Sequence, residues 1–214
     1  MTGRRRRRAL GTIAGLVLAA TVLAVFRIPV LQAIGWTLVV DDAIGPADVV
    51  VVSADADGEG VLEAADLIHE GVAARAAVFA DPPGVVDREF LRRGVAYEDR
   101  AEVSIRQLMA LRVTSVEQIP VASPGTEAEA HSLPAWCDRH RFRSVVVVST
   151  RDHSRRMRRV IDRAMKHHPT RVTVRPARYS EFDPDRWWQT RNGIRTTIIE
   201  LQKLLLDVIR HPTS

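Results

Sequence analysis

The chain has 214 residues, of which 46% are hydrophobic and 27% are charged, so it can bury a core of α/β-domain size and is not disordered throughout. Its net charge of +5 comes from the tail Arg4–Arg8, and without these five arginines the chain is neutral. Because the basic charge is confined to this tail, we expect no nucleic-acid partner. The single cysteine, Cys137, excludes an internal disulfide.

An uncharged run of 18 residues, Ala9–Phe26, follows the arginine tail. A helix of this length covers about 27 Å, the thickness of a bilayer core. Arginines before such a run favour a cytoplasmic N-terminus. We therefore predict a single-pass anchor in a bacterial cytoplasmic membrane, with the main domain outside. The partial small-x-small match at Val22-Leu23-Ala24 leaves a cleaved signal peptide as the alternative.

The predicted organisation has four parts. They are a basic cytoplasmic tail over 1–8, a transmembrane anchor over 9–27, a membrane-proximal linker over 28–47 and an α/β domain over 48–210.

Within that domain, short apolar runs alternate with longer amphipathic ones. Strands are predicted over 48–53, 75–80, 116–121, 144–149 and 171–175. Helices are predicted over 60–70, 86–93, 99–111, 126–140, 154–167 and 185–209, the last interrupted near Asn192-Gly193. This alternation is typical of βαβ units. It predicts a three-layer Rossmann-like sandwich with a mostly parallel five-stranded sheet, preceded by the transmembrane helix.

The two most apolar runs, Val49–Val52 and Val145–Val148, are expected to be neighbouring, parallel, central strands. Their adjacency would create a cleft at the carboxyl edge of the sheet, where ligands of such folds bind. His153 follows the second run, and we predict it as the catalytic acid/base. The ligand- or anion-binding residues predicted around it are Ser53, Ser123, Thr126, Ser149, Arg151, Arg155 and Arg156.

Simpler interpretations compete at two of these loops. Thr126 and Glu129 match a T-x-x-E capping box, which alone explains both residues. Asp55, Asp57 and Glu59 are interpreted as a solvated acidic turn at a helix start. The sequence contains no CxxC or HExxH, so we predict no metal site.

The chain resembles the YdcF/SanA/ElyC-like family of bacterial proteins (domain of unknown function 218), as a divergent member. The resemblance covers residues 37 to 207, beginning with the stretch Asp42–Val52 before the first predicted helix. The family's S-x-N-T-x-E-N-A is matched at Ser123, Thr126 and Ala130, and its T-S-x-x-H-x-x-R-A at Ser149, His153 and Arg156. The closing W and E-x-x-K are matched at Trp187 or Trp188, Glu200 and Lys203.

The resemblance implies a Rossmann-like fold and a role in the bacterial envelope, in barrier function and in peptidoglycan and lipid-carrier metabolism. Several family positions differ here. Ser53-Ala54 and Asp81-Pro82-Pro83 replace two glycine pairs, and Gly125, Ala128 and Glu129 replace asparagine, glutamate and asparagine.

Two classes of function follow. The first is an enzyme of envelope maintenance that acts on a phosphorylated or lipid-linked metabolite, with His153 moving the proton and the arginines holding the anion. The second is an envelope accessory or binding protein without catalysis. A nucleotide or S-adenosylmethionine binder is a weaker third alternative, because the glycines are replaced. The sequence identifies no cofactor.

The predicted topology can be tested with reporter fusions after Ser214. A reporter that is active only outside the cytoplasmic membrane should work, and one that is active only in the cytoplasm should be silent. The opposite pattern would overturn the extracytoplasmic location.

Overall fold

A computed structural model describes residues 21, 25–40 and 42–212. Its five strands are all parallel, in the order β3-β2-β1-β4-β5, which is a Rossmann-like α/β arrangement. Their bounds are β1 Val49–Val52, β2 Ala76–Phe79, β3 Val116–Ile119, β4 Ser144–Ser149 and β5 Arg171–Pro176. The predicted strand positions and the parallel sheet are therefore confirmed.

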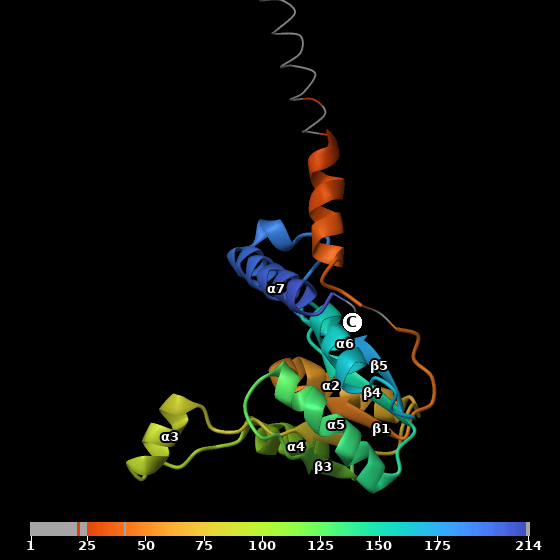
Figure 1. Cartoon of the computed structure of the whole chain (residues 1–214), viewed down its shortest axis with the longest axis vertical. Helices are drawn as coiled ribbons and strands as arrows, with labels where there is room; N and C mark the ends of the chain where they lie inside the picture. Colours follow the sequence, from red (N-terminus) through yellow and green to blue (C-terminus); the bar gives the residue numbers. More distant parts are fainter. Residues whose placement is uncertain (1–20, 22–24, 41, 213–214) are drawn as a thin grey trace, which may run out of the picture.

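Helices cover both faces of this sheet, as Figure 1 shows. Helices α2 and α4 pack on one face and α5 and α6 on the other, each over its own apolar cluster. The bounds are α2 Asp57–His69, α3 Val85–Arg92, α4 Arg100–Ala110, α5 Thr126–His140, α6 Ser154–Ala164 and α7 Arg191–Arg210, with short 3₁₀ turns η1 Ala54–Ala56 and η2 Trp187–Gln189. The predicted three layers are present.

The two valine runs lie at the centre of the sheet. Val49–Val52 pairs in parallel with Val145–Val148, and every one of these side chains is buried. Alternate valines face opposite helical layers, so the runs are apolar at every position. Gly60 permits α2 to lie close to β1, because a Cβ there would fall 2.4 Å from the Ala56 Cβ. The predicted adjacency of these two strands is confirmed.

The chain enters the domain through a helix over residues 25–36, followed by an extended segment. The first part of the predicted linker is therefore helical. Within residues 21, 25–40 and 42–212, no helix has both the length and the hydropathy needed to cross a membrane. Most of the predicted anchor, residues 9–27, lies outside the described residues and stays a prediction.

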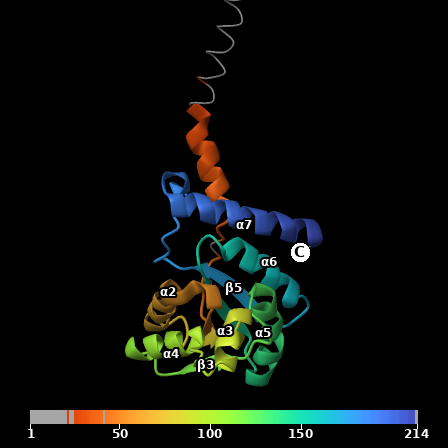
Figure 2. The same ribbon diagram turned by 90° about the vertical axis from the view of Figure 1, so that its left-hand side faces the viewer.

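The N-terminal helix is joined to the segment before α7. The Trp187 indole N–H donates to the Leu31 carbonyl at 2.7 Å, and the Trp36 indole donates to Asp185 at 2.9 Å. Gly35 lies against the Pro184 carbonyl, where no Cβ would fit. In both Figure 1 and Figure 2, α7 lies crosswise at the base of this helix, between it and the α/β layers.

Two predicted helix boundaries differ from the structure. Helix α2 begins at Asp57, three residues before the predicted start at Gly60, because the acidic turn already belongs to its first turn. The predicted closing helix is divided at Thr190, whose side chain accepts the Gly193 N–H and caps α7. The interruption was predicted two residues later.

The carboxylate of Glu63 on α2 is fully buried and fixes the chain after β5. It accepts hydrogen bonds at 2.9 Å from the Arg175 guanidinium and from the Arg178 guanidinium and backbone N–H. A buried carboxylate is retained in an apolar layer only when it is paired in this way.

We therefore predict that Glu63→Gln lowers the free energy of unfolding by about 2 kcal/mol, because one acceptor becomes a donor that faces an arginine. Denaturant unfolding of the full chain in mild detergent measures this. The control is Glu70→Gln, which removes an exposed partner of the same Arg178 and should cost about 0.5 kcal/mol or less. Equal losses for the two variants would contradict this role of Glu63.

Candidate functional site

The candidate site lies at the carboxyl edge of the sheet, where β1 and β4 are neighbours. One of the connections from these strands runs to the β2 side of the sheet and the other to the β5 side. Such a switch in direction leaves a crevice between the two loops that follow the strands. Ser53 follows β1, and His153 occupies the N-cap position of α6 after β4.

His153 is the centre of a buried hydrogen-bonded relay. Its Nε2 lies 3.1 Å from the Thr126 hydroxyl, and its Nδ1 lies 3.3 Å from a Glu200 carboxylate oxygen. The side chain is only 3% exposed. Three elements, α5, α6 and α7, thus contribute a hydroxyl, an imidazole and a carboxylate in one line.

Glu200 also pairs with two cations. Arg156 donates to it at 3.1 Å and Lys203 at 2.7 Å. Burial alone would raise the pKa of Glu200, but the hydrogen bond from His153 and the charge of Arg156 outweigh burial and hold that pKa well below its usual range. Glu200 is therefore an ionised acceptor.

This charge state assigns the His153 tautomer. Because an ionised carboxylate only accepts, His153 Nδ1 carries the hydrogen that Glu200 receives. In the neutral ring, Nε2 is then an acceptor for the Thr126 hydroxyl. Arg156 donates to that same hydroxyl oxygen at 3.1 Å. Thr126 is thus polarised from both sides, which is the arrangement of an activated hydroxyl beside its base.

The start of α5 does not form the predicted capping box. Gly125 occupies the N-cap with φ 112°, a conformation that favours glycine, and no side chain caps the helix. Thr126 is the first helical residue, and its hydroxyl points to His153 and Arg156 instead. The expectation of simple capping by Thr126 and Glu129 was therefore wrong.

Glu129, one turn into α5, is buried beside this relay. Burial raises its pKa from 4.5 to about 8, and the nearby charge of Asp55 adds to the rise, while the Ala54 backbone N–H lowers it. Such a group is mostly a neutral carboxylic acid at pH 7. In the sequence, its match to the capping-box motif indicated only a helix-capping role.

Several buried polar atoms around the relay are unsatisfied. In the described part of the chain, Ser53 Oγ, Ser149 Oγ and Glu129 Oε2 have no hydrogen-bond partner. By strand alternation, Ser53 and Ser149 share the face of Val51 and Val147, which is the layer of α5 and α6. A polar cluster with unmade hydrogen bonds is a place where a polar ligand can bind.

The structure therefore brings together some of the predicted site residues. Thr126, His153 and Arg156 are in direct contact, and Ser53 and Ser149 are buried at the adjoining strand ends.

Three predicted ligand-binding residues do not join the cluster. The Arg155 guanidinium donates to the Thr37 and Val39 carbonyls and so holds the entering segment. Ser123 is exposed, and Arg151 is partly buried. Within residues 21, 25–40 and 42–212, neither side chain hydrogen-bonds to the relay.

Sequence reasoning missed Glu200, Lys203 and Glu129 as site residues. In the sequence, Glu200 and Lys203 are identified only as matches to the family's E-x-x-K motif. Their i, i+3 spacing places both on one helix face, and the chemistry of that face could have suggested a partner for His153.

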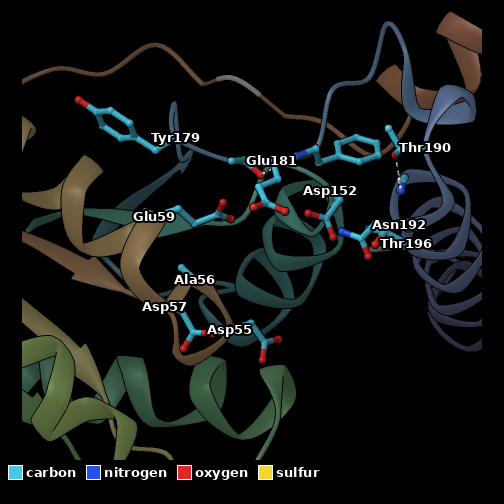
Figure 3. Close-up of a pocket in the computed structure, with 13 residues that line it drawn as sticks. Asp55, Ala56, Asp57, Glu59, Asp152, Tyr179, Glu181, Thr190, Asn192 and Thr196 are labelled. Carbon is cyan, nitrogen blue, oxygen red and sulfur yellow. Dashed lines mark hydrogen bonds between the residues drawn. The ribbon is translucent and has the colours of Figure 1, made fainter.

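An acidic cavity of about 660 Å³ adjoins the relay on the side of the β1 loop. Figure 3 shows carboxylates from three segments around it: Asp55, Asp57, Glu59, Asp152 and Glu181. Asp55 connects this cavity to the relay, because its carboxylate lies 3.9 Å from His153 Nε2.

The carboxylates of the cavity are crowded. Burial raises the pKa of Glu59, and the charge of Asp152 adds to that rise. Burial likewise raises the pKa of Asp152, with a further contribution from Glu200. Asp55 and Asp57 are exposed at the start of α2, as the sequence predicted, whereas Glu59 is partly buried. Cationic groups would be favoured in this cavity.

A smaller recess of about 150 Å³ lies on the opposite side of the relay, between α5, α6 and α7. Arg156, Lys203 and Arg210 line it together with Glu127 and Asp207. Both acidic groups are already paired, Asp207 with Arg159 and Arg163 and Glu127 with Arg163. His211 lies near these two carboxylates in a group that could hold a metal ion, but the paired arginines already balance its charge.

No family model matches the chain, and no curated protein matches it in sequence. The resemblance to the YdcF/SanA/ElyC-like family therefore stays a prediction.

The raised pKa of Glu129 predicts a pH-dependent stability. Its pKa in the folded chain lies above the ordinary 4.5, so its favourable contribution is complete at low pH and is lost as pH rises through about 8. Glutamine cannot ionise. Relative to Glu129→Gln, the wild type should therefore lose stability between pH 5 and pH 8, by at most about 1.4 kcal/mol per pH unit.

Denaturant unfolding at a series of pH values measures this difference. The control is Glu102→Gln, which changes an exposed carboxylate on α4 and should leave the pH profile parallel to that of the wild type. A constant difference between Glu129→Gln and the wild type across this range would contradict the assignment of Glu129 as a neutral acid.

Proposed function

We propose that this chain is a membrane-anchored enzyme of bacterial envelope maintenance, which acts on a phosphorylated or lipid-linked metabolite outside the cytoplasmic membrane. The observation that carries the proposal is the relay in which His153 joins the Thr126 hydroxyl to the Glu200 carboxylate beside Arg156. A hydroxyl, a base and an orienting carboxylate in this order are the parts of a proton-transfer site.

In the proposed reaction, His153 takes the proton from the attacking oxygen, which belongs to Thr126 or to a water or hydroxyl in its place. That oxygen forms a bond to phosphorus while the bond from phosphorus to the leaving oxygen breaks. Glu129, neutral at pH 7, gives its proton to the leaving oxygen. Glu200 stabilises the imidazolium that forms on His153.

The negative charge of the substrate would lie on the basic side of the relay. Arg156 and Lys203 face the small recess there, and the first backbone N–H groups of α5 point out of the helix start. The unsatisfied hydroxyls of Ser53 and Ser149 could donate to further phosphate oxygens. A guanidinium and a helix start together are the usual partners of a phosphoryl group.

The location rests on the sequence. The tail Arg4–Arg8 and the uncharged run Ala9–Phe26 support an anchor whose C-terminal domain is outside. The motifs that carry the family resemblance include Thr126, His153, Arg156, Glu200 and Lys203. These five residues all lie in one cluster. That convergence supports the proposed role in the envelope.

The alternative is an accessory protein that binds the same class of metabolite without turning it over. The burial of the relay favours it, since Thr126 is 5% exposed and His153 3%. Ser53-Ala54 also replaces a family glycine pair, and its two side chains would leave a ligand less room to approach the backbone of the β1 loop.

A thermal-shift screen of the full chain in detergent tests binding. The panel contains undecaprenyl-phosphate analogues, sugar phosphates and nucleotides. We expect phosphorylated lipid analogues to raise the melting temperature and Arg156→Gln to abolish the shift. An unchanged shift in Arg156→Gln would overturn the anion-binding role of Arg156.

Complementation of a deletion strain separates the two classes. His153→Gln retains a hydrogen-bond donor for Glu200 but cannot move a proton, so the barrier function of the envelope should be lost while ligand binding persists. Turnover should fall by about 10²–10⁴, the usual contribution of a general base. His131→Gln changes an exposed histidine on α5 and should complement fully.

Full complementation by His153→Gln would establish the accessory protein instead. Because His153 is buried and bonded through both ring nitrogens, His153→Ala should cost about 1–3 kcal/mol of stability. Glutamine is therefore the sharper test.

A further inference from the structure

Helix α7 buries polar residues and exposes many aliphatic ones. Its buried residues are Thr197, Glu200 and Asp207, and the latter two pair with arginines of α6. Leu201 and Leu204 pack against the apolar cluster of Leu38, Val39 and Phe182, but the exposed large hydrophobic residues are Ile194, Ile198, Ile199, Leu205, Leu206, Val208 and Ile209. A helix on the surface of a water-soluble domain normally turns its aliphatic residues inward.

The exposed aliphatic residues form one continuous stripe. Ile194, Ile198, Leu205 and Ile209 recur at helical spacing along almost the whole of α7. Leu205 is 60% exposed and Ile209 is 67% exposed. Isolated exposed leucines are common, but a contiguous stripe of this length indicates a surface that is covered by something apolar.

The position of α7 in the fold indicates what covers its exposed aliphatic residues. In Figure 1 and Figure 2, α7 lies crosswise at the base of the helix over residues 25–36, and its outward side faces the direction in which that helix leaves the domain. The chain before this helix is the uncharged run Ala9–Phe26. Two tryptophan contacts, Trp187 with Leu31 and Trp36 with Asp185, fix the N-terminal helix to the segment that leads into α7.

The residues around the stripe fit a lipid headgroup layer. Arg191, Arg195 and Arg210 of α7 and Arg27 of the N-terminal helix are also exposed, and they would pair with anionic headgroups. Trp36 is 48% exposed at the end of the N-terminal helix, and tryptophan is enriched at membrane–water interfaces. Exposed arginines beside aliphatic residues fit an anionic bilayer better than the apolar centre of an interface between two copies of this chain.

We propose that α7 is an interfacial helix, whose aliphatic face lies at the boundary between headgroups and acyl chains of an anionic bilayer. This inference rests on the membrane anchor of the proposed function. It also deepens that function, because Leu206 and Arg210 of α7 line the basic recess next to Arg156. A lipid-linked phosphate would then reach the relay from the bilayer surface, along α7.

The test uses the full chain reconstituted in vesicles of phosphatidylcholine and phosphatidylglycerol. Leu205→Cys carries an environment-sensitive fluorophore at the centre of the stripe. Its control is Leu91→Cys on α3, an exposed leucine that lies far from the N-terminal helix in Figure 1. The native Cys137 is fully buried and should not react with the label.

We expect the emission at position 205 to shift to the blue on reconstitution and to be quenched by nitroxide-bearing lipids. The emission at position 91 should stay that of a water-exposed label. A label at 205 that remains quenched only by aqueous iodide would overturn the inference. Self-quenching between labels at 205, without quenching by lipid, would show a second copy on this face and would also overturn it.

Extraction of the vesicles with alkaline carbonate separates the two proposals. If the chain stays with the lipid after extraction while the label at 205 is aqueous, the anchor stands and the interfacial helix fails. If the chain is extracted, the membrane location in the proposed function fails, and the interfacial helix fails with it.

Discussion

The carboxylate of Glu200 is the contact on which the arrangement of the site depends. It holds His153 and Arg156 of α6 and pairs with Lys203 one turn along α7. A carboxylate in a buried position requires such partners, and without Glu200 the Nδ1 of the buried His153 would be a donor with no acceptor. One interaction therefore fixes the imidazole, orients the guanidinium toward Thr126 and docks α7 on the α/β layers.

The pairing of Glu200 with residues of α6 also determines which residues of α7 face the domain and which face outward. Because Glu200 and Asp207 are turned inward to meet the arginines of α6, most of the aliphatic residues of the helix lie outward, on the side from which the N-terminal helix leaves. Leu201 and Leu204 pack instead against the small cluster of Leu38, Val39 and Phe182. The same packing thus places Glu200 beside His153 and leaves an aliphatic face exposed, so the proposed site and the proposed membrane-facing surface depend on one helix.

The sequence predicted the sheet well because the valine runs are apolar at every position, which only strands buried on both faces require. It also predicted that Thr126, His153 and Arg156 converge, since loops after parallel strands share one edge. It did not predict the buried position of Glu129, because that residue also matched a helix cap. Nor did it predict the position of Arg155, whose partners are backbone carbonyls over a hundred positions away, which no local pattern encodes.

The two sides of the site around His153 differ in their charge. The acidic cavity lies on the side of the β1 loop, and the basic recess lies on the side of α7. The phosphoryl group of the proposed substrate would therefore lie on the α7 side, whose outer face is the aliphatic stripe.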